Sequence, residues 1–173
     1  MAATSADVDP DTRAAITDFL FQEAYLIDER RFGEWLDMFD EEARYVVPVR
    51  VTREAGADWQ LSPDSTIFDD TKQTLGIRIA RLRTDFAWAE QPPSRTRHYV
   101  SNVLVDAGEA SGEYTVRSNC LVYRSRGNLP RPDLFSCARR HELRLDPAGL
   151  KIKNRWTVLD ESMVSAHNLS IFL

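Results

Sequence analysis

Four side chains in this sequence could together carry out acid–base chemistry. Tyr25 and Asp28 are three residues apart in a segment with helical periodicity, so they lie on one helical face. His98 and His141 lie in segments predicted to be strands, from which either imidazole could reach that face across a sheet. In a closed pocket, such a set suits general acid–base catalysis on a small apolar substrate. The alternative is structural: Asp28 is then a solvated helix residue, and the two histidines are hydrogen-bonded strand residues.

Metal and nucleotide motifs are missing from the sequence. His98, His141 and His167 lie far apart, and no CxxC, CxH, HExxH or HxxxH spacing brings ligands together. There is also no GxGxxG and no P-loop. Cys120 and Cys137 lie in predicted strands, where we expect two small buried hydrophobic residues rather than a disulfide. The sequence therefore predicts no metal-binding and no nucleotide-binding residues in this chain.

The composition indicates one compact domain over residues 1–173, with residues 1–9 as a flexible N-terminal segment. A chain of 173 residues that is 43% hydrophobic can bury a sizeable core. The net charge of −5 and the pI near 5.2 argue against nucleic-acid and anionic-membrane partners, which bind cationic surfaces. With no signal-peptide pattern and no apolar run of membrane-spanning length, we expect a cytoplasmic protein.

Helical periodicity dominates the first half of the sequence. Asp9 followed by Pro10 predicts the start of a helix that runs to about Arg31. Apolar residues then recur at helical spacing from Phe32 to Phe39, which predicts a short second helix. A third helix is predicted after a loop at 54–63, and its apolar face would comprise Phe68, Leu75, Ile79, Leu82 and Phe86.

Alternation with a period of two dominates the second half. A first strand is predicted at 43–51, where Pro48 indicates a sheet edge or a bulge. Four more strands are predicted in succession, separated by turns rich in Gly and Pro, at 95–106, 113–125, 134–146 and 150–160. Helices followed by an antiparallel meander predict an α+β domain whose curved sheet packs around about three helices.

Arginine and tryptophan residues suggest a subunit interface. Arginines concentrate in the sheet half despite the negative net charge, where they are either solvated or interfacial. Trp59, Trp88 and Trp156 join that argument, and Trp88 lies outside any periodic pattern. The arginines concerned are Arg95, Arg97, Arg117, Arg124, Arg126, Arg131, Arg139, Arg140, Arg144 and Arg155.

The candidate interface residues lie in two segments. In FAWAEQPPSRTRHYVSNV, the two prolines end a helical region before a strand, so Trp88, Arg95 and Arg97 project from a rigid corner. The sequence ends in Ile171, Phe172 and Leu173, and we expect these apolar residues to be ordered against the chain's own sheet or a neighbouring subunit.

Three stretches together resemble a known family. They are QEAYLIDERRFGEWLDMFDEEARYVVPV, RLRTDFAWAEQPPSRTRHYVSNV and VLDESMVSAHNLSIFL. The first alone fits the broad NTF2-like group, which includes scytalone dehydratase and ketosteroid isomerase. With the other two, in this order over nearly the whole chain, the sequence resembles the small (β) subunit of the Rieske non-haem iron aromatic-ring-hydroxylating dioxygenases.

The resemblance implies a fold, partners and a function. It implies an NTF2-like cone that associates as a trimer within an α3β3 hexamer with a large (α) subunit. The [2Fe–2S] Rieske cluster and the mononuclear Fe(II) would belong to the large subunit, with NAD(P)H used by separate electron-transfer components. This chain would be the non-catalytic structural subunit of an enzyme that converts an arene to a cis-dihydrodiol. Naphthalene, biphenyl, a benzene derivative or an aromatic acid would all be compatible with it. The alternative is a stand-alone NTF2-like dehydratase, isomerase or small-ligand-binding protein.

Overall fold

A computed structural model describes residues 8–51, 61–84, 87–127, 130–166 and 168–173. Its helices are α1 (Pro10–Asp28), α2 (Phe32–Asp37), α3 (Lys72–Arg81) and the short 3-10 helix η1 (Trp88–Glu90). Its strands are β1 (Phe39–Arg50), β2 (Leu61–Thr71), β3 (Arg95–Ala107), β4 (Glu113–Ser125), β5 (Asp133–Asp146) and β6 (Gly149–Leu159).

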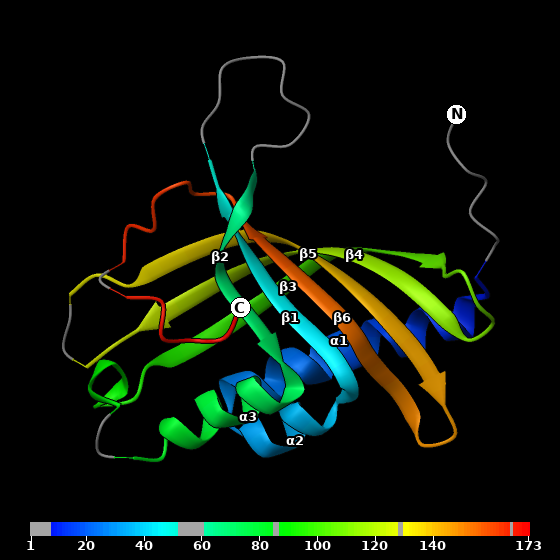
Figure 1. The fold of residues 1–173 in the computed structure, drawn as a ribbon, viewed down its shortest axis with the longest axis horizontal. Coiled ribbons are helices and arrows are strands. Elements are labelled where there is room, and N and C mark those ends of the chain that lie inside the picture. The colour runs from blue at the N-terminus through cyan, green and yellow to red at the C-terminus, as the bar shows by residue number, and fades with distance from the viewer. Residues whose placement is uncertain (1–7, 52–60, 85–86, 128–129, 167) are drawn as a thin grey trace.

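The described strands form one curved mixed sheet in the order β2-β1-β6-β5-β4-β3. β1 and β6 pair in parallel, and the other neighbours are antiparallel, so the last four strands form the predicted meander. The sheet arches over α1, α2 and α3, which lie together on its concave side (Figure 1). The predicted α+β class and the curved, largely antiparallel sheet are therefore confirmed.

The first helix forms where the sequence predicts it. The Asp9 side chain caps it by accepting a hydrogen bond from the backbone N of Thr12 at 2.9 Å, and Pro10 occupies the first turn. The helix ends at Asp28, three residues earlier than expected. The chain reverses at Arg30, whose positive φ of 58° does not belong to a helix. This early end places Asp28 at the edge of the cone, next to β3.

The segment before α3 is a correction to the sequence prediction. Leu61–Thr71 is the edge strand β2, whereas we expected a loop to Pro63 and a helix that included Phe68. Phe68 pairs with Val47 of β1, and the helix begins only after Thr71, whose side chain and that of Thr74 form a capping box. Phe68 packs under the Arg78 guanidinium at 3.9 Å, so it shares a surface with α3 without belonging to the helix. Phe86, also assigned to this helix, lies outside the described residues.

The boundary between α2 and β1 also differs from the prediction. α2 ends at Asp37, and Phe39 is a buried first residue of β1 rather than the last apolar residue of the helix. β2 covers the outer edge of β1, so Pro48 is not at the sheet edge. It lies at an irregularity in the β1–β2 pairing, which confirms the expected bulge.

An irregularity in β3 sets which residues face the helices. Before Asn102, the buried residues of β3 are the even-numbered Thr96 and His98, which lie on the concave face. After Asn102 the buried residue is the odd-numbered Val105, so the side chains that point inward change from even to odd positions. The change occurs where the β3–β4 register shifts between Ser101 and Leu104, and Asn102 there has a positive φ of 53°. The opposite phase faces away from the helices, and we call this side the outer face of the sheet.

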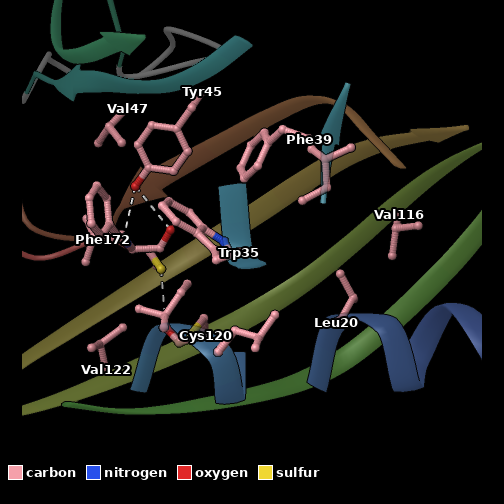
Figure 2. Packing of buried hydrophobic residues seen from close by; sticks show 14 of the residues in the cluster. Leu20, Trp35, Phe39, Tyr45, Val47, Val116, Cys120, Val122 and Phe172 are labelled. Carbon is pink, nitrogen blue, oxygen red and sulfur yellow. Dashed lines mark hydrogen bonds between the residues drawn. The ribbon is translucent and has the colours of Figure 1, made fainter. Parts of the chain in front are cut away.

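The concave side is filled with apolar side chains. Trp35, Phe39 and Tyr45 make edge-to-face contacts in its centre, and Phe172 lies beside Trp35 (Figure 2). Cys120 and Cys137 face each other across β4 and β5 as buried free thiols, as the sequence predicts. The rest of this cluster includes Ile16, Leu20, Leu75, Val116, Val122, Phe135, Leu143 and Ile152.

Candidate functional site

The carboxylate of Asp28 joins the end of α1 to the inner face of β3. Its Oδ1 accepts a hydrogen bond from the Thr96 hydroxyl at 2.8 Å, and its Oδ2 accepts one from the backbone N of His98 at 2.9 Å. The Nδ1 of His98 lies 2.6 Å from Oδ1, and its Nε2 lies 3.1 Å from the backbone oxygen of Phe172. Both ring nitrogens of His98 therefore already have partners within this chain.

The charge state of Asp28 follows from these contacts. Burial raises the pKa of its carboxyl, but the hydrogen bonds from His98 and Thr96 outweigh that effect and hold the pKa below its usual range. Asp28 is an ionised residue that accepts hydrogen bonds. It is not the solvated helix residue that the structural alternative assumed, although His98 is hydrogen-bonded as that alternative expected.

A second buried cluster was not predicted from the sequence, and it centres on Glu23 of α1. The Glu23 side chain is fully buried and accepts hydrogen bonds from Nη1 of Arg155 and from Nε1 of Trp35 at 3.2 Å. Nε2 of His141 lies 3.3 Å from the other carboxylate oxygen, within ion-pair distance but without hydrogen-bond geometry. Arg139 is also buried nearby and acts on the pKa of Glu23.

The charges of this cluster explain its pKa values. Burial raises the pKa of Glu23, but Arg155 and His141 lower it far more, so the carboxylate is ionised. Burial lowers the pKa of His141 and opposes the effect of Glu23, so this imidazole is neutral at pH 7. The cluster is thus a buried ion pair with a neutral histidine beside it. Glu23 offered no sequence signal beyond a polar residue on the apolar face of a predicted helix.

Residues 171–173 reach into this same interior. The three residues are at most 6% exposed, so they pack against the chain's own sheet, which is one of the two arrangements expected. The Leu173 backbone oxygen accepts hydrogen bonds from Nη2 of Arg155 and from the Tyr45 hydroxyl, the latter at 3.2 Å. The Tyr45 hydroxyl also accepts from the backbone N of Leu173 at 3.0 Å. Tyr45 and Arg155, which could otherwise contact a substrate inside the cone, are thus hydrogen-bonded to Leu173.

The predicted acid–base set does not assemble. Asp28 and His98 do meet, but the Tyr25 side chain is 53% exposed on α1. His141 belongs to the separate cluster around Glu23. Among the described residues, aromatic and aliphatic side chains fill the interior, where this chemistry would need an open pocket. The stand-alone dehydratase or isomerase alternative therefore loses its site.

The predicted corner residues lie on the surface. Trp88 is 75% exposed, and its backbone oxygen accepts a hydrogen bond from Nη2 of Arg126 at 3.1 Å. β3 begins at Arg95, and both Arg95 and Arg97 are exposed on the outer face. Nη1 of Arg97 donates a hydrogen bond to the backbone oxygen of Thr96 at 3.0 Å, and it lies 3.9 Å from the Glu29 carboxylate in a long ion pair.

An apolar strip continues from this corner along the outer face. Tyr99 pairs with Leu121, and Tyr123 pairs with Leu134, across β3, β4 and β5. A hollow of about 880 Å³ adjoins the strip, and its lining includes Leu104, Pro48 and Trp156. We define the outer strip as Tyr99, Leu104, Leu121, Tyr123 and Leu134, which are 37–60% exposed.

The arginines of the sheet divide into two groups that the sequence could not separate. Arg124, Arg139 and Arg155 are at most 2% exposed, so they belong neither to a solvated face nor to an accessible interface. Arg97 and Arg117 have side chains that are 59% exposed. Trp59 and His167, also named from the sequence, lie outside the described residues.

The donor groups of the described residues do not form a metal centre. No cluster of three His, Cys, Asp or Glu side chains converges within residues 8–51, 61–84, 87–127, 130–166 and 168–173. In the same part of the chain, no helix is both long enough and apolar enough to cross a membrane.

The fold defines a class: an NTF2-like cone, whose interior is filled by apolar side chains in the described part of the chain. The family model described as "Ring hydroxylating beta subunit" matches residues 22–166. Two curated relatives are each 38% identical over 96% of this chain and 91% of their own length. They are the biphenyl 2,3-dioxygenase subunit beta of Rhodococcus jostii and the benzene 1,2-dioxygenase subunit beta of Pseudomonas putida. The chain belongs to the ring-hydroxylating dioxygenase β-subunit family, and it is therefore a component of an oxidoreductase.

Solved structures agree on the fold. A naphthalene 1,2-dioxygenase structure with indole bound in its active site superposes with a TM-score of 0.86, at 24% identity, over 97% of this chain and 89% of that chain. A structure described as a putative scytalone dehydratase from Novosphingobium aromaticivorans gives a TM-score of 0.62 at 19% identity, over 91% of this chain and 90% of that chain. The same cone thus occurs in dioxygenase components and among NTF2-like enzymes.

Proposed function

We propose that this chain is the non-catalytic assembly subunit of an aromatic-ring dioxygenase. It binds the large subunit and further copies of itself as a trimer in an α3β3 hexamer, in the cytoplasm. The [2Fe–2S] Rieske cluster, the mononuclear Fe(II) and the arene belong to the large subunit. Electrons come from NAD(P)H through separate components, and the assembled enzyme adds both atoms of O2 to give a cis-dihydrodiol.

One observation carries the proposal: Asp28 and His98, the acid–base candidates that do meet, are bonded to groups inside the chain, while Trp88 and Arg97 are exposed. Asp28, His98 and Tyr45 have partners within the cone. In contrast, Trp88 is 75% exposed beside the exposed Arg97. Exposed aromatic and arginine side chains are typical anchors of protein–protein interfaces.

The proposed interface comprises the corner of Trp88, Arg95 and Arg97 together with the outer strip. Ile171, Phe172 and Leu173 were candidate interface residues too, but their burial leaves little surface for direct contact. We therefore assign them an indirect role: they hold β3 in place through the hydrogen bond of His98 to Phe172.

The test is co-expression of the chain with its large subunit, carrying Trp88→Ala and Arg97→Ala together. We expect assembly to weaken by about 2 kcal/mol or more, because both side chains are exposed until a partner covers them. Size-exclusion chromatography with light scattering measures the assembly, and metal analysis measures iron in the complex that remains. Phe21→Ala, an exposed aromatic on α1 away from the corner, is the matched control. Normal assembly with lost turnover would contradict the proposal.

A further inference from the structure

Cys120 and Cys137 have the register and spacing that a disulfide requires. They are directly opposite each other on the antiparallel strands β4 and β5, and both are 2% exposed. Opposite residues of such strands have Cα atoms about 4.5 or about 5.5 Å apart, and a disulfide spans about 4.4–6.8 Å. The Cys137 thiol donates a hydrogen bond to the backbone oxygen of Cys120 at 3.5 Å, so its sulfur is turned toward the facing residue (Figure 2).

A buried guanidinium lies beside this pair of thiols. Arg139 follows Cys137 on the same face of β5 and is 2% exposed. Within the described part of the chain, its Nε and Nη2 atoms have no hydrogen-bond partner. Its neighbours across the sheet, Ser118 and Thr157, carry hydroxyl groups and bring no charge. A buried cation in such surroundings is costly unless an anion compensates it.

The cysteines are the groups that remain to compensate Arg139. The side chains near this guanidinium that can carry a negative charge are Cys120, Cys137, Glu23 and Tyr45. Glu23 is already paired with Arg155. Burial raises the pKa of the Tyr45 hydroxyl, so it is a neutral phenol at pH 7. Ionisation of a cysteine would therefore balance the charge of Arg139.

The two thiols are not equivalent, and Cys137 is the one that loses its proton more readily. A hydrogen bond from Cys120 and the charge of Arg139 hold the pKa of the Cys137 thiol below its usual value, against the effect of burial. The same hydrogen bond and burial raise the pKa of Cys120, which stays a thiol. A thiolate beside a thiol suits a reaction in which the first sulfur attacks an oxidant and the second forms the disulfide.

We propose that Cys120 and Cys137 are a redox-active pair that hydrogen peroxide oxidises to a disulfide linking β4 and β5. The Cys137 thiolate attacks one peroxide oxygen, the O–O bond breaks, and the other oxygen takes up a proton and leaves as water. Cys137 is then a sulfenic acid, and the Cys120 sulfur attacks it. The S–O bond breaks, and the oxygen leaves as a second water with the Cys120 proton. The two thiols lose two electrons, and peroxide gains them.

This chemistry is independent of the proposed assembly function, which depends on the corner and the outer strip on the opposite face. The test exposes the full chain to hydrogen peroxide near neutral pH and then alkylates it with iodoacetamide in urea. Since the sequence contains only these two cysteines, mass spectrometry accounts for every thiol. We expect a chain lighter by two hydrogen atoms and without alkylation, a peptide joining Cys120 to Cys137, and recovery of both thiols with dithiothreitol.

Single-cysteine variants test the order of the steps. In Cys120→Ser, the reaction should stop at a sulfenic acid on Cys137, which dimedone traps. In Cys137→Ser, Cys120 should react with peroxide at least about tenfold more slowly. Equal rates in the two variants, disulfides between chains, or no disulfide in the folded unmodified chain would overturn the proposal.

A third set of variants tests the guanidinium. Arg139→Gln should slow the oxidation of Cys137 at least about tenfold, and Arg139→Lys should restore most of the rate, because lysine keeps the positive charge. Arg140→Gln, the matched control, changes the next side chain of β5, which is exposed, and should leave the rate unchanged. A folded Arg139→Gln variant that reacts at the unmodified rate would refute the assignment. Circular dichroism checks folding, and if Arg139→Gln does not fold, the single-cysteine variants decide the matter.

Discussion

The two faces of the sheet differ in which residues they bury: the concave face buries several polar and charged residues, and the outer face exposes large apolar ones. The concave side buries charged and polar groups, among them Glu23, His98 and Arg155, and gives each a partner from the same chain. The outer face leaves large apolar groups such as Tyr99 and Leu121 without a cover in the single chain. A monomeric soluble protein would show neither arrangement to this extent. The difference indicates that the residues of the concave face stabilise the fold, and that the outer face is a surface for contact with another subunit.

We expect the largest loss of stability from a change in the buried Glu23 cluster of the concave side. Glu23→Gln removes the negative charge that compensates Arg155, and it leaves a guanidinium uncompensated in the core. We expect the free energy of unfolding to fall by about 3–5 kcal/mol, as for other broken buried pairs. Urea denaturation of the single chain measures it. Glu142→Gln, which disrupts a partly exposed pair with Arg140, should cost less than about 1 kcal/mol. Equal costs for the two changes would mean that the buried cluster has no special role.

On the outer face we expect a substitution to weaken assembly much more than it destabilises the single chain. Leu121→Glu places a charge in the centre of the outer strip, where the side chain is 42% exposed. The single chain should lose less than about 1 kcal/mol of stability, because the site is a solvated strand position. Assembly with the large subunit should weaken by about 2 kcal/mol or more, since a charge would be buried in the contact. A variant that assembles normally would remove the outer strip from the proposed interface.

A smaller effect should appear in how the free energy of unfolding depends on pH, because of the buried His141. The pKa of His141 is lowered by burial, so below its ordinary value of 6.5 the unfolded chain takes up a proton that the folded chain does not. The free energy of unfolding should therefore fall as the pH drops below about 6.5, by up to about 1.4 kcal/mol per pH unit. The groups that face this imidazole are Glu23, Arg139 and Arg155.

The measurement compares the chain with its His141→Gln variant in urea at pH 7.5, 6.5 and 5.5. Glutamine does not titrate, and the other acidic groups contribute to both proteins, so their effect largely cancels in the difference. The variant should lack the extra slope between pH 6.5 and 5.5. Parallel pH curves would show that His141 takes up no proton on unfolding.

Sequence reasoning succeeded where a pattern is local. The cap at Asp9, the bulge at Pro48 and the first residue of β3 at Arg95 depend on the residues themselves and their immediate neighbours. It failed at β2, because Phe68 has the right spacing from Leu75 to imitate a helical face, while pairing with β1 fixes the segment as a strand. A contact with a distant strand leaves no periodic signal in the segment that makes it.

The same limit applies to the candidate site. Asp28 and His98 were named together from their chemistry, and they do meet. Glu23 and Tyr45 were not named, because a glutamate on a helix and a tyrosine in a strand are ordinary until the fold brings Glu23 to Arg155 and Tyr45 to the backbone of Leu173. Burial of Arg155 likewise depends on that convergence, and residue type alone favours exposure.

The central claim is that the buried Asp28–His98 pair orders the chain and takes no part in arene oxidation. It is tested most directly by turnover per mole of iron in the assembled dioxygenase with His98→Gln in this subunit. Assembly and iron content are measured on the same sample. The account predicts turnover per iron within about twofold of the unmodified enzyme, since general acid–base catalysts contribute about a hundredfold or more. A loss of about a hundredfold with intact assembly and iron would contradict it and make His98 a catalytic residue.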